Sequence, residues 1–177
     1  GDQEFTPGWT SYDTRLQYQT YDVTSLLNRG ENAMGIILGD GWYRGNLGWG
    51  DNRNNWGEHL SAIAQVMITY ADGRSEVMGS DGSWKASKGP IVSSDIYNGE
   101  VYDANLELKG WSNPGFDDSK WQAVKIADEK SSNLIAPEGP PVRIVNQLEP
   151  LSITKTGDGW RVDMGQNMVG WIRLRAS

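Results

Sequence analysis

The 177-residue sequence predicts an all-β fold, a β-sandwich, and three observations support this prediction. Short segments of alternating or β-branched residues recur at roughly 8–12-residue spacing, with turn-forming residues between them. Helical periodicity is slight and never extends over the ten or so residues of an ordinary helix. The composition includes 22 Gly and several Asp-Gly pairs, which is typical of a chain with many turns.

Local patterns justify each element of this fold. The clearest strand signal covers residues 59–71, in which apolar side chains from Leu60 to Tyr70 alternate with polar ones. Asp72-Gly73 predicts a hairpin turn into a return strand. Strands are also predicted over 14–23, 32–38, 75–78, 83–86, 91–96 and 100–106, and single capped turns over 25–28 and 117–121.

The apolar positions of these segments predict the hydrophobic core. In a strand with one buried face, every second side chain points inward. The core residues expected on this basis are Leu16, Ile36, Leu38, Leu60, Ala62, Ala64, Val66, Ile68, Trp84 and Trp121.

Prolines mark a boundary late in the chain. Residues 136–150 hold four of its seven prolines, and proline cannot donate a hydrogen bond to a central strand. We therefore expect one domain over residues 1–140, and a linker with the first strands of a following β-domain over residues 141–177. Strands are predicted at 151–156, 160–163 and 169–175, and we expect them to add to an edge of the first domain. The abrupt start of the sequence suggests a piece of a longer protein.

Charge and rare residues exclude several classes of function. The net charge of −7 argues against nucleic-acid binding, which requires a basic surface. No apolar run approaches the length of a membrane span. Cysteine is absent and His59 is the single histidine, so disulfides, thiolate metal sites and a Ser-His-Asp triad are excluded or hard to build.

Residues 39–58 form the least ordinary segment, with six Gly, three Trp, one Tyr and a run of Asp and Asn. Sugar binding requires such a mixture, because aromatic rings cover the apolar face of a pyranose while amides and carboxylates bind its hydroxyls. The nine Trp and seven Tyr of the chain favour the same interpretation. The alternative is a long loop that caps the sandwich, with Trp42 and Trp49 in the core.

Two groups of polar residues are candidate sites of chemistry. Asp51 and Asn52, with Asn54, Asn55 and Glu58, could hold Ca²⁺ through oxygen ligands, although Arg53 breaks the EF-hand pattern and Asp/Asn clusters are commonly turns. Asp95 and Glu100 flank an Asn98-Gly99 turn of predicted type I′ and could be paired glycosidase carboxylates. Carboxylates beside a turn are usually solvated, so no catalytic residue is predicted.

Four segments carry a resemblance to a known family. PGWTSYDTRLQYQTYDVTSLLNRGENAMGIILGDGWYRGNLGW (7–49), SSDIYNGEVYDANLE (93–107) and GWSNPGFDDSKWQAV (110–124) resemble the N-terminal accessory domain of bacterial α-L-rhamnosidases of glycoside hydrolase family 78. VDMGQNMVGWIRLR (162–175) resembles the opening of the β-domain that follows it in those enzymes.

The resemblance implies a jelly-roll β-sandwich, similar to galactose-binding domains. It also implies a parent enzyme that releases terminal α-L-rhamnose by inversion in an (α/α)6 barrel outside this chain, and we expect that enzyme to be extracellular or periplasmic. The chain itself would be a non-catalytic accessory domain. Its partners would be a rhamnose-containing glycan and the neighbouring domains of the parent, with no nucleic acid or membrane.

By the same resemblance, the domain would bind rhamnose through Ca²⁺. The implied metal ligands are Asp51, Asn52 and Asn98. The same three residues would contact the sugar, together with an aromatic wall formed by Trp42, Tyr43, Trp49 and Trp56. The alternative function is a structural domain that packs against the catalytic barrel and binds no sugar.

Overall fold

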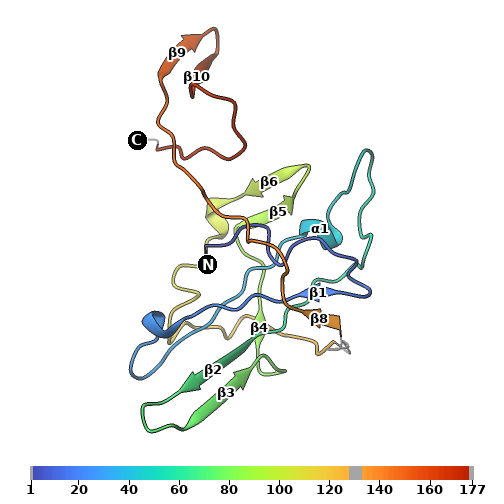
Figure 1. The fold of residues 1–177 in the computed structure, drawn as a ribbon, viewed down its shortest axis with the longest axis vertical. Helices are drawn as coiled ribbons and strands as arrows, with labels where there is room; N and C mark the ends of the chain where they lie inside the picture. Colours follow the sequence, from blue (N-terminus) through green and yellow to red (C-terminus); the bar gives the residue numbers. More distant parts are fainter. Residues whose placement is uncertain (1, 128–132, 176–177) are drawn as a thin grey trace. The chain divides into compact units, whose positions relative to one another are not determined.

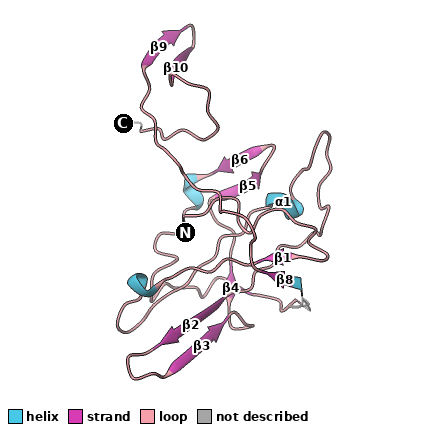
Figure 2. Ribbon diagram, viewed as in Figure 1, coloured by secondary structure: helices cyan, strands magenta, loops and turns pink. Residues whose placement is uncertain are grey.

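A computed structural model describes residues 2–127 and 133–175 of the chain and confirms the all-β prediction (Figures 1 and 2). Within these residues the helices are short: α1 (Gly41–Arg44) and the 3-10 turns η1 (Thr24–Leu26) and η2 (Ala104–Leu106). The strands are β1 (Leu16–Gln17), β2 (Gln65–Thr69), β3 (Ser75–Gly79), β4 (Lys85–Ala86), β5 (Ile91–Asp95), β6 (Gly99–Tyr102), β7 (Gln122–Ala123), β8 (Leu134–Ile135), β9 (Ser152–Thr156) and β10 (Gly159–Asp163). No helix in this part of the chain has the length and apolarity that crossing a membrane requires.

The described strands pair in five two-stranded sheets. Three are hairpins between neighbouring strands, β2–β3, β5–β6 and β9–β10. The other two join distant segments: β1 runs parallel to β8, and β4 runs antiparallel to β7. Contacts divide the chain into two compact units, residues 5–140 and residues 2–4 with the segment from 141 onward.

The β2–β3 hairpin follows its sequence signal closely. Thr69 pairs with Ser75, and Gly73 in the intervening turn has a φ of +85°, which glycine adopts without strain. Val66 and Ile68 are half-buried whereas Met67 between them is exposed, so the predicted alternation is present.

The β5–β6 turn is longer than predicted. Asp95 pairs with Gly99, so three residues rather than two form the loop, and Gly99 has a φ of +80°. A three-residue loop that ends on a left-handed glycine is another common hairpin connection. It forms here because the Asp95 carboxylate accepts hydrogen bonds from the N–H groups of Tyr97 and Asn98.

Other expected strands are shorter or absent among the described residues. Residues 14–23 form only β1, and residues 32–38 lie outside the paired strands. In that second segment Gly35 lies against the ring of Trp111, where a Cβ atom would come within 2.2 Å. Tight packing of the backbone against an indole ring thus replaces strand pairing at this point.

The core is smaller than the sequence predicts. Tyr12, 8% exposed, is the buried hydrophobic residue of the described ranges. Leu16, Leu60, Ala64, Val66, Ile68, Trp84 and Trp121 are half-buried. The assignment of Ile36, Leu38 and Ala62 to the core is wrong, since all three are exposed. Alternation identifies the inward face of a strand, but small sheets cover that face incompletely.

The second unit contains the β9–β10 hairpin, which turns at Gly157 and Asp158. Glu4 forms an isolated antiparallel bridge with Val142, and Asp2 pairs with Arg143 at 3.2 Å. β9 and β10 pair with each other in a two-stranded sheet. That these strands add to an edge of the first domain stays a prediction. Residues 169–175, predicted as a strand, are unpaired.

Candidate functional site

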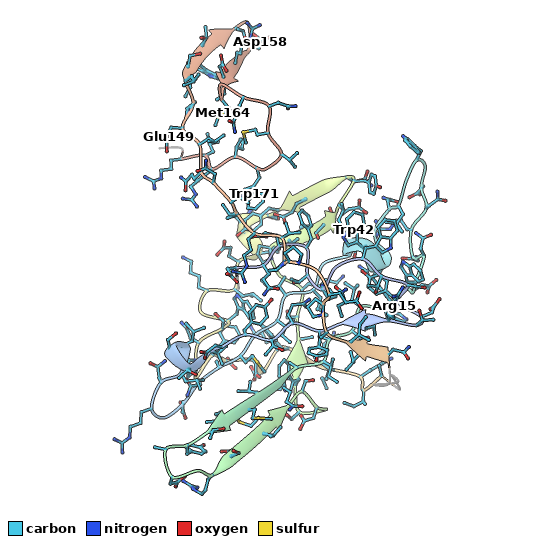
Figure 3. All side chains as sticks on the ribbon, in the orientation of Figure 1. Arg15, Trp42, Glu149, Asp158, Met164 and Trp171 are labelled. Carbon is cyan, nitrogen blue, oxygen red and sulfur yellow. The ribbon has the colours of Figure 1, made fainter. Side chains whose placement is uncertain are left out.

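The candidate site is built around α1 and the segment that follows it, residues 45–57, here called the glycine-rich loop. Gly41 begins α1 with a φ of +50°, and the N–H of Gly45 closes the turn on the Gly41 carbonyl at 3.2 Å. This helical turn was not predicted. Trp42 lies on this turn (Figure 3).

A buried carboxylate joins the two ends of the glycine-rich loop. Asp40 is 8% exposed and forms ion pairs of 2.5 Å with Arg44 on α1 and with Arg53 on the returning limb. Arg44 also donates to the carbonyl of Glu58 at 3.2 Å. A buried charge is stable only when it is paired and hydrogen-bonded. Asp40 therefore holds both limbs of the loop at its base.

A second carboxylate joins the loop to the β5–β6 hairpin. Asp95 accepts a hydrogen bond of 2.7 Å from the backbone N–H of Asn46, in addition to those from Tyr97 and Asn98 at 2.9 and 3.0 Å. Burial by itself raises the pKa of the Asp95 carboxyl. The three N–H donors and the charge of Arg53 outweigh burial, so the pKa lies below its ordinary value.

Aromatic rings from two other segments lie against Trp42 of α1. Trp42 stacks on Trp9 with ring centroids 5.0 Å apart and an interplanar angle of 9°. The ring of Tyr97, in the β5–β6 turn, meets Trp42 edge-on at 6.5 Å. Trp9 and Tyr97 are both 55% exposed. This surface was not predicted as a unit, because Trp9 lies far from Trp42 in the sequence.

A second aromatic cluster lies around Tyr12. Its ring contacts Tyr43 and Trp56 edge-on, both at 5.5 Å. Its hydroxyl donates to the Gly8 carbonyl at 2.6 Å, and burial raises its pKa to about 12. Tyr43 and Trp56, two of the residues predicted for the sugar wall, are thus half-buried and packed against the core.

The remaining predicted site residues are exposed. Trp49 is 98% exposed between two glycines of positive φ, so the alternative that places it in the core is wrong. Asp51 has no hydrogen bond or ion pair within the described ranges. Asn52 donates its amide to the Trp49 carbonyl at 3.3 Å, which leaves the side-chain oxygen of Asn52 available.

Asn98 belongs to the same region through its neighbours. The Asn46–Asp95 hydrogen bond and the Trp42–Tyr97 contact bring the β5–β6 turn to the base of the glycine-rich loop. The two segments that carry the predicted ligands therefore contact each other. Glu100, which with Asp95 formed the candidate pair of glycosidase carboxylates, is exposed on β6.

A cavity of about 230 Å³ lies beside this junction. The paired side chains of Asp40, Arg44 and Arg53 line it, and Ser93 and Ser94 of β5 line it as well. Its charged residues are those that hold the loop, so the cavity is part of the support of the site.

The predicted ligand set fits a calcium ion in its chemistry. Asp51, Asn52 and Asn98 offer one carboxylate and two amide oxygens, and Ca²⁺ takes six to eight oxygen ligands in flexible geometry. Within the described ranges, no group of three or more His, Cys, Asp or Glu side chains could hold a metal. A site formed by these three residues would therefore depend on amide oxygens and on ligands from outside the protein.

The sequence profile of the α-L-rhamnosidase N-terminal domain matches residues 1–146. An α-L-rhamnosidase of Streptomyces avermitilis is 46% identical over all of this chain, and one of Formosa agariphila is 38% identical. The chain spans only 17% and 19% of the length of these two relatives.

Solved structures agree with the sequence comparison. A native α-L-rhamnosidase of Aspergillus terreus matches with a TM-score of 0.84 and 40% identity, over 97% of this chain and 20% of that one. The Streptomyces avermitilis α-L-rhamnosidase complexed with L-rhamnose matches with a TM-score of 0.84 and 41% identity, over 95% of this chain and 16% of that one.

Proposed function

Because the chain belongs to the family of α-L-rhamnosidase N-terminal domains, we propose that it is a carbohydrate-binding accessory domain. In this proposal, it holds terminal α-L-rhamnosyl groups by means of calcium at the glycine-rich loop. The parent enzyme, of which the chain is a small part, hydrolyses α-L-rhamnosyl linkages. The chain itself performs no catalysis.

One observation carries the proposal: the glycine-rich loop and the β5–β6 turn meet at their bases. Each segment contributes predicted ligands, Asp51 and Asn52 from the loop and Asn98 from the turn. A binding site formed by two segments needs such a junction, because neither segment alone supplies the required set of oxygens. The L-rhamnose in the similar Streptomyces avermitilis structure supports the choice of sugar.

Bound calcium would supply a centre that coordinates vicinal hydroxyls of the sugar. Asp51 provides the charge that favours a cation, and the amide oxygens of Asn52 and Asn98 complete the protein's share of the ligands. Three protein ligands leave coordination positions for sugar hydroxyls or water. The free carboxylate of Asp51 supports this role, since it has no partner within the described ranges.

Aromatic rings would cover the apolar side of the sugar, including its methyl group. Trp42 and the exposed Trp49 are the predicted residues nearest to this task, and Trp9 extends the surface of Trp42. The contacts of Tyr43 and Trp56 with Tyr12 favour a supporting role for these two rings.

Isothermal titration calorimetry of the chain with L-rhamnose tests the proposal. We expect saturable binding in calcium and none after a chelator removes the ion. Titration with D-galactose in calcium is the control for non-specific sugar binding. Absence of rhamnose binding in calcium would contradict the proposed function.

A second function, packing against neighbouring domains, has its own support. Met67 and Val77 are cross-strand partners of the β2–β3 hairpin, and their side chains are 66% and 56% exposed. Exposed apolar neighbours of this kind are common where another domain covers the surface. Polar substitution of both residues would then reduce the stability of the parent enzyme while rhamnose binding by this chain stays unchanged.

A further inference from the structure

We infer that Asp95 is the positioning residue of the calcium and rhamnose site: it holds the glycine-rich loop and the β5–β6 turn at a fixed separation without itself binding the ion. This inference rests on the proposed function. It goes beyond that function because it assigns the geometry of the site to a residue outside the predicted ligand set.

The two carboxylate oxygens of Asp95 accept hydrogen bonds from different segments. Oδ1 accepts the N–H groups of Tyr97 and Asn98, both within the β5–β6 turn. Oδ2 accepts the N–H of Asn46, which lies 49 positions away in the sequence. One oxygen thus forms the turn that carries Asn98, and the other fixes that turn to the start of the loop that carries Asp51 and Asn52.

The other partner in this bond is itself immobilised. Asn46 is 5% exposed, and it follows Gly45, whose N–H closes α1. Asp40 then ties α1 to Arg53 on the returning limb of the loop. A chain of short contacts therefore runs from Asn98 through Asp95 to both limbs of the loop.

This arrangement favours binding because calcium ligands from separate segments otherwise have to be brought together at the moment of binding. Ordering a loop on binding reduces affinity, and fixing it beforehand removes that cost. Asp95 accomplishes this with hydrogen bonds to a charged acceptor, which are stronger than those to a neutral one.

Asp95→Asn tests whether one side chain has to accept hydrogen bonds from both the β5–β6 turn and Asn46. An amide has one acceptor oxygen, and its NH₂ group cannot accept the N–H that the second carboxylate oxygen accepted. The variant can keep the turn or the bond to Asn46, but not both. The matched control is Asp81→Asn, because Asp81 uses a single oxygen for both of its bonds to Ser83 and an amide retains that oxygen.

Hydrogen exchange measured without calcium reports on the junction directly. We expect the amide of Asn46 and the amides of the glycine-rich loop to exchange about tenfold faster in Asp95→Asn, as the loss of one charge-assisted bond implies. The amides of β2 and β3 should be unaffected. Unchanged exchange at Asn46 and in the β5–β6 turn would overturn the inference.

Calcium titration of the same variants tests the consequence for the site. We expect the Kd for calcium to rise about tenfold in Asp95→Asn and to stay unchanged in Asp81→Asn. Gly73→Ala, which strains the β2–β3 turn, is the control for a general loss of stability and should leave the Kd unchanged.

Calcium binding by the wild-type chain distinguishes a failure of the role of Asp95 from a failure of the proposed function. If the wild-type chain binds calcium and Asp95→Asn binds it with the same Kd, the inference is overturned and the proposed function stands. If the wild-type chain binds neither calcium nor rhamnose, the proposed function is overturned, and this inference with it.

Discussion

At the scale of the residue, Tyr12 is both buried and hydrogen-bonded. Its ring contacts Tyr43 and Trp56, and its hydroxyl donates to the Gly8 carbonyl. The ring and the hydroxyl can be removed separately, which makes their contributions measurable.

We expect Tyr12→Phe to lower the free energy of unfolding by about 1 kcal/mol, the usual net value of one hydrogen bond. Tyr12→Ala also removes the ring and should cost roughly 3–5 kcal/mol. Urea denaturation of the chain measures both. Equal losses in the two variants would contradict the packing role assigned to the ring.

Because of Asp95, we expect the free energy of unfolding to decrease as the pH falls in the acid range. Its pKa is lowered in the folded chain, so its contribution is present above the unfolded value of about 3.9 and is lost as the pH falls through the folded value. We expect thermal unfolding of the wild-type chain to shift to lower temperature below about pH 4. The shift should be smaller in Asp95→Asn, which has no carboxylate to protonate; an equal shift in both would contradict this account of Asp95.

At the scale of the element, the β2–β3 turn can be tested through its glycine. Gly73 has a φ of +85°, and no heavy atom lies within 4 Å of the position that the Cβ atom of an alanine would take there. Substitution by alanine therefore tests backbone strain alone. We expect Gly73→Ala to cost about 1–2 kcal/mol in chemical denaturation. Gly89 has similar open space without a positive φ, and Gly89→Ala should be neutral or slightly stabilising. Equal costs would contradict the turn geometry.

Elements formed by neighbouring residues were the predictable ones. Asp72-Gly73 specified the β2–β3 hairpin because the turn and both strands lie within one short segment. The parallel pairing of Leu16 with Leu134 was not predictable, because it depends on how the whole intervening chain folds. The same reason explains why residues 14–23 form only a two-residue strand.

In the candidate site, too, features within one short segment were predictable and contacts between distant segments were not. The unusual composition of residues 39–58 singled out the segment that holds the glycine-rich loop. The family resemblance implied Asp51 and Asn52 as ligands, and this stays a prediction. Trp9 and the link between Asp95 and Asn46 were missed, since they join segments that are distant in sequence. The turn-capping bonds of Asp95 did have a local signal, a carboxylate two and three residues before the N–H groups it accepts.

At the scale of the whole molecule, the two units are joined across a proline-rich segment. The division falls between Pro140 and Pro141, within the region where the sequence changes in composition. That the second unit begins a further β-domain stays a prediction. Within the second unit, residues 2–4 contact the later segment through the isolated Glu4–Val142 bridge and the exposed Asp2–Arg143 ion pair.

A chain that ends at Pro140 should therefore retain the fold of the first unit. Exposed ion pairs contribute at most about 1 kcal/mol, so the loss of the Asp2–Arg143 pair is small. We expect the thermal unfolding of this shorter chain to remain cooperative. We also expect the shorter chain to keep the calcium-dependent response to L-rhamnose. A non-cooperative transition would mean that the later segment completes the first unit.

The central claim is that rhamnose binds through an ion held by Asp51, and calorimetry of Asp51→Ala in the presence of calcium tests it most directly. The control is Asp158→Ala, which removes an exposed carboxylate from the β9–β10 turn. We predict that Asp51→Ala abolishes the heat of L-rhamnose binding while Asp158→Ala binds like the wild type. Rhamnose affinity that survives Asp51→Ala unchanged would contradict the claim.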